Sequence, residues 1–167
     1  MIEILILYTI NKREKTLYSI RKDIIEIFGT FTKPSIGTIY PALKRLLKED
    51  AVSVYDKMSE GGKKSSYFSI TKKGLELFRK YFFESVSDNP SLFYTHLQAR
   101  IATMSMLSDD DKQQFIEENI RKIDLYKFEL ENKLNDEFID LDKYQRELLK
   151  RTLSEIEALK HFIQGLK

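Results

Sequence analysis

Apolar residues at helical spacing divide the first part of the chain into three predicted helices. The three patterns cover residues 2–10, 17–28 and 35–49. Thr16 and Ser35 stand at the start of the second and third patterns, where a hydroxyl oxygen can accept a hydrogen bond from a free backbone N–H group. Gly29 ends the second helix, and residues 30–34 form a short turn before the third. Helix, helix, turn and helix in this order predict a helix-turn-helix.

After this motif the apolar pattern changes from helical to alternating spacing. Residues 51–57 and 65–70 each have the pattern of a short strand. The residues between them, 58–64, contain two glycines and two lysines, a composition typical of a turn. Two strands joined in this way form a hairpin, which in this position is the wing of a winged helix-turn-helix. A further helix is predicted for residues 72–87, capped by Thr71.

Three more amphipathic helices are predicted for the second half of the chain. Their patterns cover residues 92–107, 108–134 and 142–164. Ser91 is expected to cap the first of them, and three aspartates in the first turn of the second complement the helix dipole. The turn-forming residues 88–91 mark a boundary. The sequence therefore predicts a mainly α protein with a small β-hairpin, in which a winged helix-turn-helix domain (1–87) precedes an α-helical domain (88–167).

The two long helices at the end of the chain are expected to form an antiparallel hairpin. An isolated pair of helices buries little apolar surface, so the seam is expected to pack against a second copy of the chain. The alternative is that the hairpin folds back onto the first domain. The seam residues expected at the dimer interface are Ile120, Ile123, Leu130, Leu149, Ile156 and Ile163.

Charge is distributed unevenly between the two halves of the chain. The whole sequence carries 28 Lys+Arg and 26 Asp+Glu residues. Residues 1–87 hold 16 of the basic and 10 of the acidic residues, whereas residues 88–167 hold 12 and 16. A basic first half and an acidic second half indicate a module that binds a polyanion, joined to one that does not. A chance distribution is the alternative.

Composition also disfavours several functional classes. The chain has no cysteine, so it has no disulfide and no thiolate metal site, which fits a cytoplasmic protein. No apolar run is long enough for a transmembrane helix, and no membrane partner is expected. His96 and His161 are the only histidines, and they lack the spacing of metal ligands or catalytic motifs. We therefore expect no enzyme activity, no catalytic or metal site and no cofactor.

The candidate nucleic-acid site is the polar face of the third predicted helix. Hydroxyl groups come first along this face and cations follow, with no acidic residue before Glu49. Gly37 costs a helix about 1 kcal/mol relative to alanine, and the missing side chain would let DNA approach the backbone. Hydroxyls and N–H groups of the first turn can bind phosphate at the positive end of the helix. Lys63 and Lys64 of the wing are expected at the flank of the DNA.

Each of these candidates has a structural alternative. The cations of the helix could form a solvated face, and the wing lysines could serve solubility. Tyr40 could pack against the second helix, and Tyr18 could be half-buried, as helical tyrosines commonly are.

The sequence Pro-Ser-Ile-Gly-Thr-Ile-Tyr-Pro-Ala-Leu at residues 34–43 is distinctive. Together with Glu-Gly-Gly at 60–62, Tyr67 and Thr-Lys-Lys-Gly at 71–74, it resembles the PadR family of winged-helix transcriptional regulators over the first half of the chain. One departure is Thr-Leu-Tyr at 16–18, where the family often has His-Gly-Tyr. The resemblance implies a dimeric DNA-binding repressor with a helical C-terminal dimerisation domain, often released by a small ligand.

The resemblance and the chain's own pattern together give a set of residues expected to contact DNA. Those implied by the resemblance are Tyr18, Ser35, Thr38, Tyr40, Lys44 and Arg45. The pattern of this chain adds Lys33, Gly37, Lys63 and Lys64. Aromatic residues of the second half could line an effector pocket or belong to the core; they are Phe93, Tyr94, Phe115, Tyr126 and Phe128.

We therefore expect a sequence-specific transcriptional regulator. It would be a homodimeric repressor that binds double-stranded DNA at a palindromic operator, with helix 35–49 in the major groove and the 58–64 wing at the flank. A winged helix used only for protein contact is the alternative, although such a helix would expose apolar residues in place of the cations.

Overall fold

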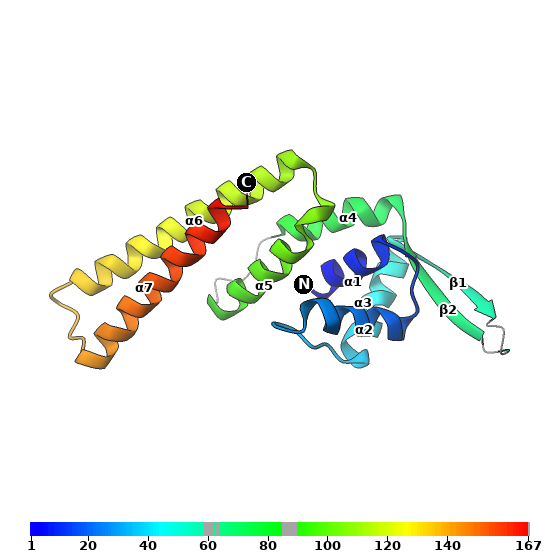
Figure 1. Ribbon diagram of the computed structural model, residues 1–167, viewed down its shortest axis with the longest axis horizontal. Coiled ribbons are helices and arrows are strands. Elements are labelled where there is room, and N and C mark those ends of the chain that lie inside the picture. Colours follow the sequence, from blue (N-terminus) through cyan, green and yellow to red (C-terminus); the bar gives the residue numbers. More distant parts are fainter. Residues whose placement is uncertain (59–61, 63, 85–89, 167) are drawn as a thin grey trace. The chain divides into compact units, whose positions relative to one another are not determined.

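The computed structural model describes residues 1–58, 62, 64–84 and 90–166. Its elements fall into two compact units, Met1–Leu107 and Ser108–Lys167. The predicted fold class is confirmed, because the described residues form helices and one antiparallel hairpin (Figure 1). The units divide after Leu107, whereas the predicted domain boundary lay at residue 87, because the helix between these two points packs against the first helix of the chain. The assignment of functions to residues 1–87 and 88–167 stays a prediction.

The first unit is built around its N-terminal helix, α1. Its elements are α1 (Ile2–Asn11), α2 (Leu17–Phe28), α3 (Ile36–Lys48), β1 (Val52–Met58), β2 (Lys64–Ile70), α4 (Lys72–Phe83), α5 (Pro90–Thr103) and the short 3-10 helix η1 (Met104–Met106). α1 packs against α2, α3, α4 and α5. Its residues Ile4, Leu5, Ile6 and Leu7 are at most 2% exposed. A helix that is hydrophobic on nearly all sides is buried on nearly all sides, and α1 is therefore the core of this unit.

Local capping signals fix where three helices begin, as predicted. In α2, α3 and α4, the hydroxyl of the residue before the helix accepts a hydrogen bond from a first-turn N–H group. The pairs are Ser19 N to Thr16 Oγ1 (3.3 Å), Thr38 N to Ser35 Oγ (3.2 Å) and Gly74 N to Thr71 Oγ1 (3.0 Å).

Two other helix boundaries differ from the prediction. α4 ends at Phe83 because Glu84 adopts an extended backbone, with a ψ angle of 137°. Residues 85–87, the remainder of the predicted helix, lie outside the described part of the chain. α5 begins at Pro90, so Ser91 lies inside this helix and is not its cap. Proline suits the first helical position because an N–H group there would have no partner within the helix.

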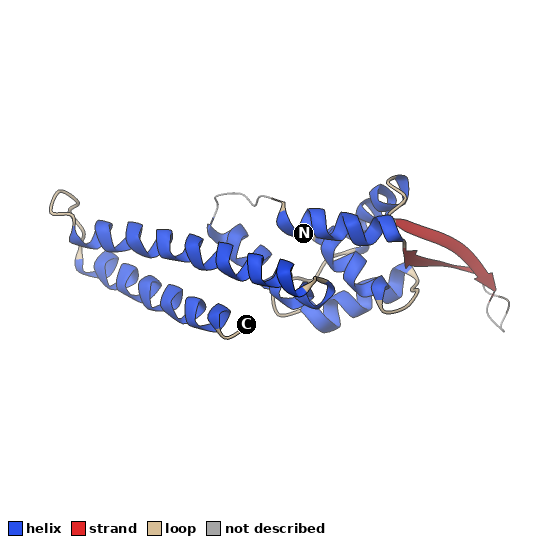
Figure 2. Cartoon of the chain, turned by 90° about the horizontal axis from the view of Figure 1, so that it is seen from above, coloured by secondary structure: helices blue, strands red, loops and turns tan. Residues whose placement is uncertain are grey.

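The predicted hairpin is present, and β1 and β2 pair in antiparallel fashion along their whole length. A third segment joins β2 at Lys15, whose backbone exchanges hydrogen bonds of 3.0 and 2.8 Å with Phe68. This bridge ties the turn before α2 to the base of the hairpin. Figure 2 shows the two strands extending away from the helices of the first unit as a wing. Residues 59–61 and Lys63, at the tip, lie outside the described residues.

Gly74 lies in the first turn of α4, against the carbonyl group of Ala51. A Cβ atom at this position would lie 2.1 Å from the Ala51 oxygen and 2.7 Å from a side-chain carbon of Ile70. We expect Gly74→Ala to destabilise the protein by about 2 kcal/mol, as overpacking does, when measured by urea denaturation. Gly165→Ala is the control, since its Cβ would meet nothing closer than 3.4 Å. Equal losses in the two variants would contradict this packing argument.

The second unit is an antiparallel helical hairpin of α6 (Asp109–Asn135) and α7 (Lys143–Gln164), as predicted. Ser108 caps α6, and Asp142 forms a reciprocal capping box with Gln145 at the start of α7. Ion pairs cross between the two helices at Lys127–Glu157 (2.7 Å) and Lys160–Asp124 (2.5 Å). Lys127 interrupts the apolar seam in the sequence, and its partner on α7 accounts for that interruption.

Candidate nucleic-acid interface

α3 presents one face to the core and the other to solvent. Ile39, Ala42, Leu43 and Leu46 are at most 1% exposed. The predicted DNA-contact residues of this stretch are all exposed; they are Lys33, Ser35, Gly37, Thr38, Tyr40, Lys44 and Arg45. The structure therefore exposes the predicted residues of α3 and of the turn before it to solvent.

The free face begins with a hydroxyl pair at the N-terminus of α3. Ser35 Oγ and Thr38 Oγ1 lie 3.0 Å apart, and Ser35 Oγ also accepts a hydrogen bond from Thr38 N. The first turn contains no acidic side chain. Hydroxyls and backbone N–H groups at the positive end of a helix form a suitable contact for an anion such as a DNA phosphate.

Gly37 is exposed on this face, and the fold does not require a glycine there. A Cβ atom at this position would meet only Ser35 Oγ, at an ordinary contact distance of 3.5 Å. Pro41, one turn later, is also exposed, and the helix continues through it. Among the residues that the structure describes, no other atom comes within 4 Å of that Cβ position, so this space is open to a partner.

The two tyrosines are exposed, in contrast to the structural alternatives considered for them. Tyr40 is 45% exposed and Tyr18, on α2, is 76% exposed. The ammonium group of Lys44 lies 4.6 Å from the centre of the Tyr40 ring, a cation–π contact between residues one helical turn apart. This contact holds Lys44 along the free face of α3.

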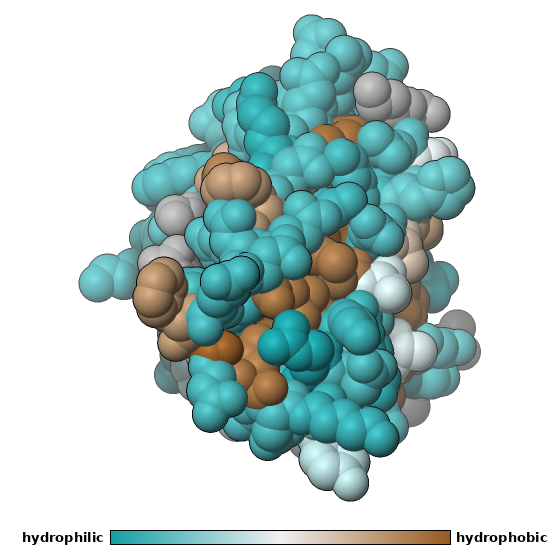
Figure 3. Space-filling view, turned by 90° about the vertical axis from the view of Figure 1, so that its left-hand side faces the viewer, coloured by the Kyte–Doolittle hydropathy of each residue, from teal (hydrophilic) through white to brown (hydrophobic). Residues whose placement is uncertain are grey.

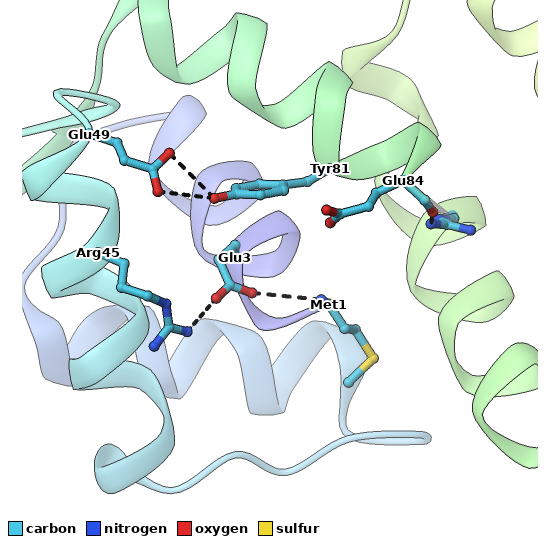
Figure 4. Close-up of polar contacts among 7 residues, drawn as sticks. Met1, Glu3, Arg45, Glu49, Tyr81 and Glu84 are labelled. Carbon is cyan, nitrogen blue, oxygen red and sulfur yellow. Dashed lines mark hydrogen bonds and ion pairs between the residues drawn. The ribbon is translucent and has the colours of Figure 1, made fainter. Parts of the chain in front are cut away.

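Arg45, next to Lys44 in sequence, is held by the protein itself. Its Nη2 atom donates a hydrogen bond of 2.5 Å to Glu3 Oε1 on α1, as Figure 4 shows. Burial acts to raise the pKa of the Glu3 carboxyl, but the hydrogen bond from Arg45 and further favourable interactions together lower that pKa below its usual value. Glu3 is therefore ionised at neutral pH and neutralises Arg45.

The wing supplies less free charge than the sequence suggests. Lys64 Nζ lies 2.7 Å from Asp56 Oδ2, across the hairpin. Hydrogen bonds from Lys64 and Ser66 lower the pKa of Asp56. Lys63, the other predicted wing contact, lies outside the described residues.

Sequence reasoning missed a group of residues at the base of the wing. Arg13, Lys22 and Tyr67 line an open cleft of about 310 Å³ beside the capping residue Thr16. Within the same cleft Lys15, only 6% exposed, forms an ion pair with Asp23. The signal in the sequence was the run of charged residues before Thr16, which by itself resembles an ordinary charged turn.

The second unit exposes apolar side chains away from the predicted seam. Of the predicted dimer residues, Ile123 and Ile163 are at most 3% exposed within the single chain, and Ile120, Leu130, Leu149 and Ile156 are partly buried. Large apolar side chains that are at least half exposed include Leu125, Phe128, Phe138, Tyr144, Leu148 and Phe162. In Figure 3, where the α6–α7 joint faces the viewer, apolar side chains lie exposed among hydrophilic ones.

Comparisons with known proteins identify a family of transcriptional regulators. A model of the "Transcriptional regulator PadR-like family" matches residues 6–80. A PadR-like transcriptional regulator from Bacillus cereus is 37% identical, with the match covering 47% of this chain and 75% of that one at a TM-score of 0.41. A PadR-family transcription regulator from Clostridium difficile is 28% identical, with the match covering 48% of this chain and 81% of that one at a TM-score of 0.42. Bacillus subtilis PadR, solved in complex with operator DNA, is 17% identical, with the match covering 98% of this chain and 94% of that one at a TM-score of 0.45. No curated protein sequence matches this chain.

Proposed function

Because this chain belongs to the PadR-like family of transcriptional regulators, we propose that it binds double-stranded DNA through α3. In this proposal α3 enters the major groove and the wing lies at the flank, so that the protein recognises a specific operator. The family assignment bears out the predicted resemblance. It also confirms that the chain is a regulator rather than an enzyme.

The observation that carries this proposal is the free face of α3. From Lys33 to Lys48 this stretch contains no acidic residue, and apart from Pro41 its exposed side chains are hydroxyls, an aromatic ring and cations. Ser35 and Thr38 would contact phosphate at the positive end of the helix, and Gly37 would allow close approach of the backbone. Lys44, held along the Tyr40 ring, would contact a phosphate or a guanine edge. Together these groups form a face complementary to a polyanion.

The alternative function, a winged helix that contacts only another protein, fits the exposed face of α3 less well. An interface of that kind is depleted of cations other than arginine at its centre and enriched in apolar residues. The free face of α3 instead carries Lys44 and Lys48, both exposed.

Repression, release by a small ligand and a cytoplasmic location stay predictions. No helix in the described ranges is long and apolar enough to cross a membrane.

The same proposal includes a homodimer formed through the second unit. Leu125 and Phe128 lie on the side of α6 opposite to Ile123 and Leu130, which share the seam with α7. Their exposure of 64% and 61% leaves an unpartnered apolar surface on the single chain. A second copy of the chain would cover it. A twofold dimer would present two α3 helices to successive major grooves, about 34 Å apart, and so favours a palindromic operator.

A direct test is quantitative DNA binding by the full-length chain. DNA fragments would first be selected from a genomic library, and the affinity for the recovered fragment would then be measured across salt concentrations. We expect Lys44→Ala to reduce the steepness of the salt dependence by about 0.9, because one neutralised phosphate is lost. Lys143→Ala, at an exposed lysine of α7, is the matched control and should leave the slope unchanged. If the wild type, Lys44→Ala and Lys143→Ala all showed the same salt dependence of affinity, the assignment of the DNA-binding face to α3 would be contradicted.

A further inference from the structure

Arg45 and Lys44 are neighbours on α3 but face different surroundings. Successive residues of a helix point about 100° apart, and only Lys44 lies along the Tyr40 ring. Arg45 turns toward α1, where Glu3 accepts its hydrogen bond. The Glu3 side chain is 16% exposed and the Arg45 side chain 57%. The pair thus joins a largely covered carboxylate to a cation that solvent still reaches.

The surroundings of Arg45 are acidic. Glu49, at the end of α3, lies 3.4 Å from the hydroxyl of Tyr81 on α4, and Figure 4 shows this contact beside the Glu3–Arg45 pair. Burial raises the pKa of Tyr81, and the negative charges of Glu49, Glu3 and Glu84 raise it further. A phosphate that approached Arg45 would therefore meet carboxylates, whereas the first turn of α3, beside Ser35, contains no acidic residue.

Transfer of Arg45 from Glu3 to a DNA phosphate would leave the Glu3 carboxylate with one charged partner, the terminal amine of Met1, whose nitrogen lies 3.6 Å from Oε2 (Figure 4). The Glu3 carboxylate would lose its short hydrogen bond while remaining mostly covered by protein. Loss of the closer of its two cationic partners is costly for a largely covered carboxylate, and this cost would offset the gain from one new phosphate contact. We therefore expect the Glu3–Arg45 pair to stay in place when DNA binds.

We propose that Glu3 is a positioning residue that withholds Arg45 from DNA, so that the phosphate-binding surface of α3 ends at Lys44. This inference rests on the proposed DNA binding through α3. It reassigns Arg45 from a DNA contact to part of the scaffold. It also gives Glu3 a role in specificity, because an additional phosphate contact strengthens binding to all sequences alike.

The proposal predicts a gain of binding when Glu3 loses its charge. In Glu3→Gln the guanidinium of Arg45 is no longer neutralised, and its exposed side chain becomes free to reach a phosphate. We expect this variant to bind a short mixed-sequence DNA duplex severalfold more tightly than the wild type. The slope of the logarithm of affinity against the logarithm of salt concentration should steepen by about 0.9, the value for one neutralised phosphate. Arg45→Ala alone should keep the wild-type slope, and the double variant Glu3→Gln/Arg45→Ala should return to it.

Glu49→Gln is the matched control, because it removes one negative charge from the same region without freeing Arg45. An equal gain in Glu49→Gln would show that only net charge matters and would overturn the proposal. A shallower slope in Arg45→Ala, or an unchanged slope in Glu3→Gln, would also overturn it. If the wild-type chain binds no duplex at low salt, the proposed function itself fails.

Thermal denaturation across pH tests whether the Glu3–Arg45 pair forms in solution. The pKa of Glu3 is lowered in the folded protein, so the pair stabilises the fold above the usual pKa of a glutamate. This stabilisation is lost as the pH falls through the lowered pKa of the folded state. The difference in melting temperature between the wild type and Glu3→Gln should therefore shrink in acid. A difference that does not change with pH would overturn the pairing on which the proposal depends.

Discussion

Replacement of Gly37 by leucine is expected to abolish specific DNA binding while making the protein more stable. The two effects have opposite signs because Gly37 serves the partner and not the fold. In the free protein the first atom of a new side chain would meet only Ser35 Oγ, at 3.5 Å. A leucine in an exposed helical position should stabilise the chain by about 0.5–1 kcal/mol relative to glycine. In the complex its side chain would occupy the space through which DNA reaches the first turn of α3.

Two measurements separate these effects. Urea denaturation should show a higher midpoint for Gly37→Leu, and titration with the selected operator should show at least a roughly 100-fold loss of affinity, about 2.7 kcal/mol. Gly37→Ala is the graded control, with a similar gain in stability and a smaller loss of affinity. Full operator affinity in the leucine variant would contradict the close approach of DNA at Gly37. A loss of stability in both variants would contradict the open space seen above this residue.

Local signals explain why much of the fold could be predicted from the sequence. Ser35, Thr71 and Ser108 cap helices because each hydroxyl interacts with backbone only three residues away. The hairpin followed from alternating side chains and a glycine-rich turn. The exposed face of α3 followed from helical periodicity, because apolar positions identify the buried side and leave the remainder to solvent.

Contacts between distant residues could not be predicted in the same way. Glu3 and Arg45 are separated by 42 positions, and Glu3 stands in a stretch that otherwise shows only apolar character. The Lys15–Phe68 bridge likewise depends on the fold bringing two segments together. As a result, sequence reasoning placed Arg45 on the DNA face, and only the structure reveals its partner.

The dimer residues illustrate a further limit of pattern reasoning. A repeating apolar seam has the same spacing whether its partner is another helix of the same chain or a second copy. In this chain α7 packs along α6, and Ile123 and Ile163 are buried without any second copy. Apolar residues outside the seam, such as Leu125 and Phe128, remain exposed on the single chain, and the periodicity did not select them.

Substitution of both Leu125 and Phe128 by glutamate is therefore expected to convert the protein into a monomer. Each side chain is more than 60% exposed in the single chain, so its loss should leave the free energy of unfolding of the monomer nearly unchanged. At a dimer interface the same changes would bury two carboxylates per chain against apolar surface, which strongly disfavours association. Light scattering at micromolar concentration should report half the mass of the wild type.

The monomer should also bind its operator much more weakly, although α3 is unchanged. A dimer that holds one half-site binds the second as an intramolecular event, and loss of this linkage costs roughly 10²–10⁴ in affinity. Binding to an isolated half-site should stay at the wild-type level, which separates a loss of pairing from damage to α3. Ser154→Glu/Gln164→Glu adds the same charge at two exposed polar positions of α7 and should remain dimeric. A dimer that survives Leu125→Glu/Phe128→Glu would exclude this surface as the interface, and the exposed Leu148 and Phe162 of α7 would then be the next positions to substitute.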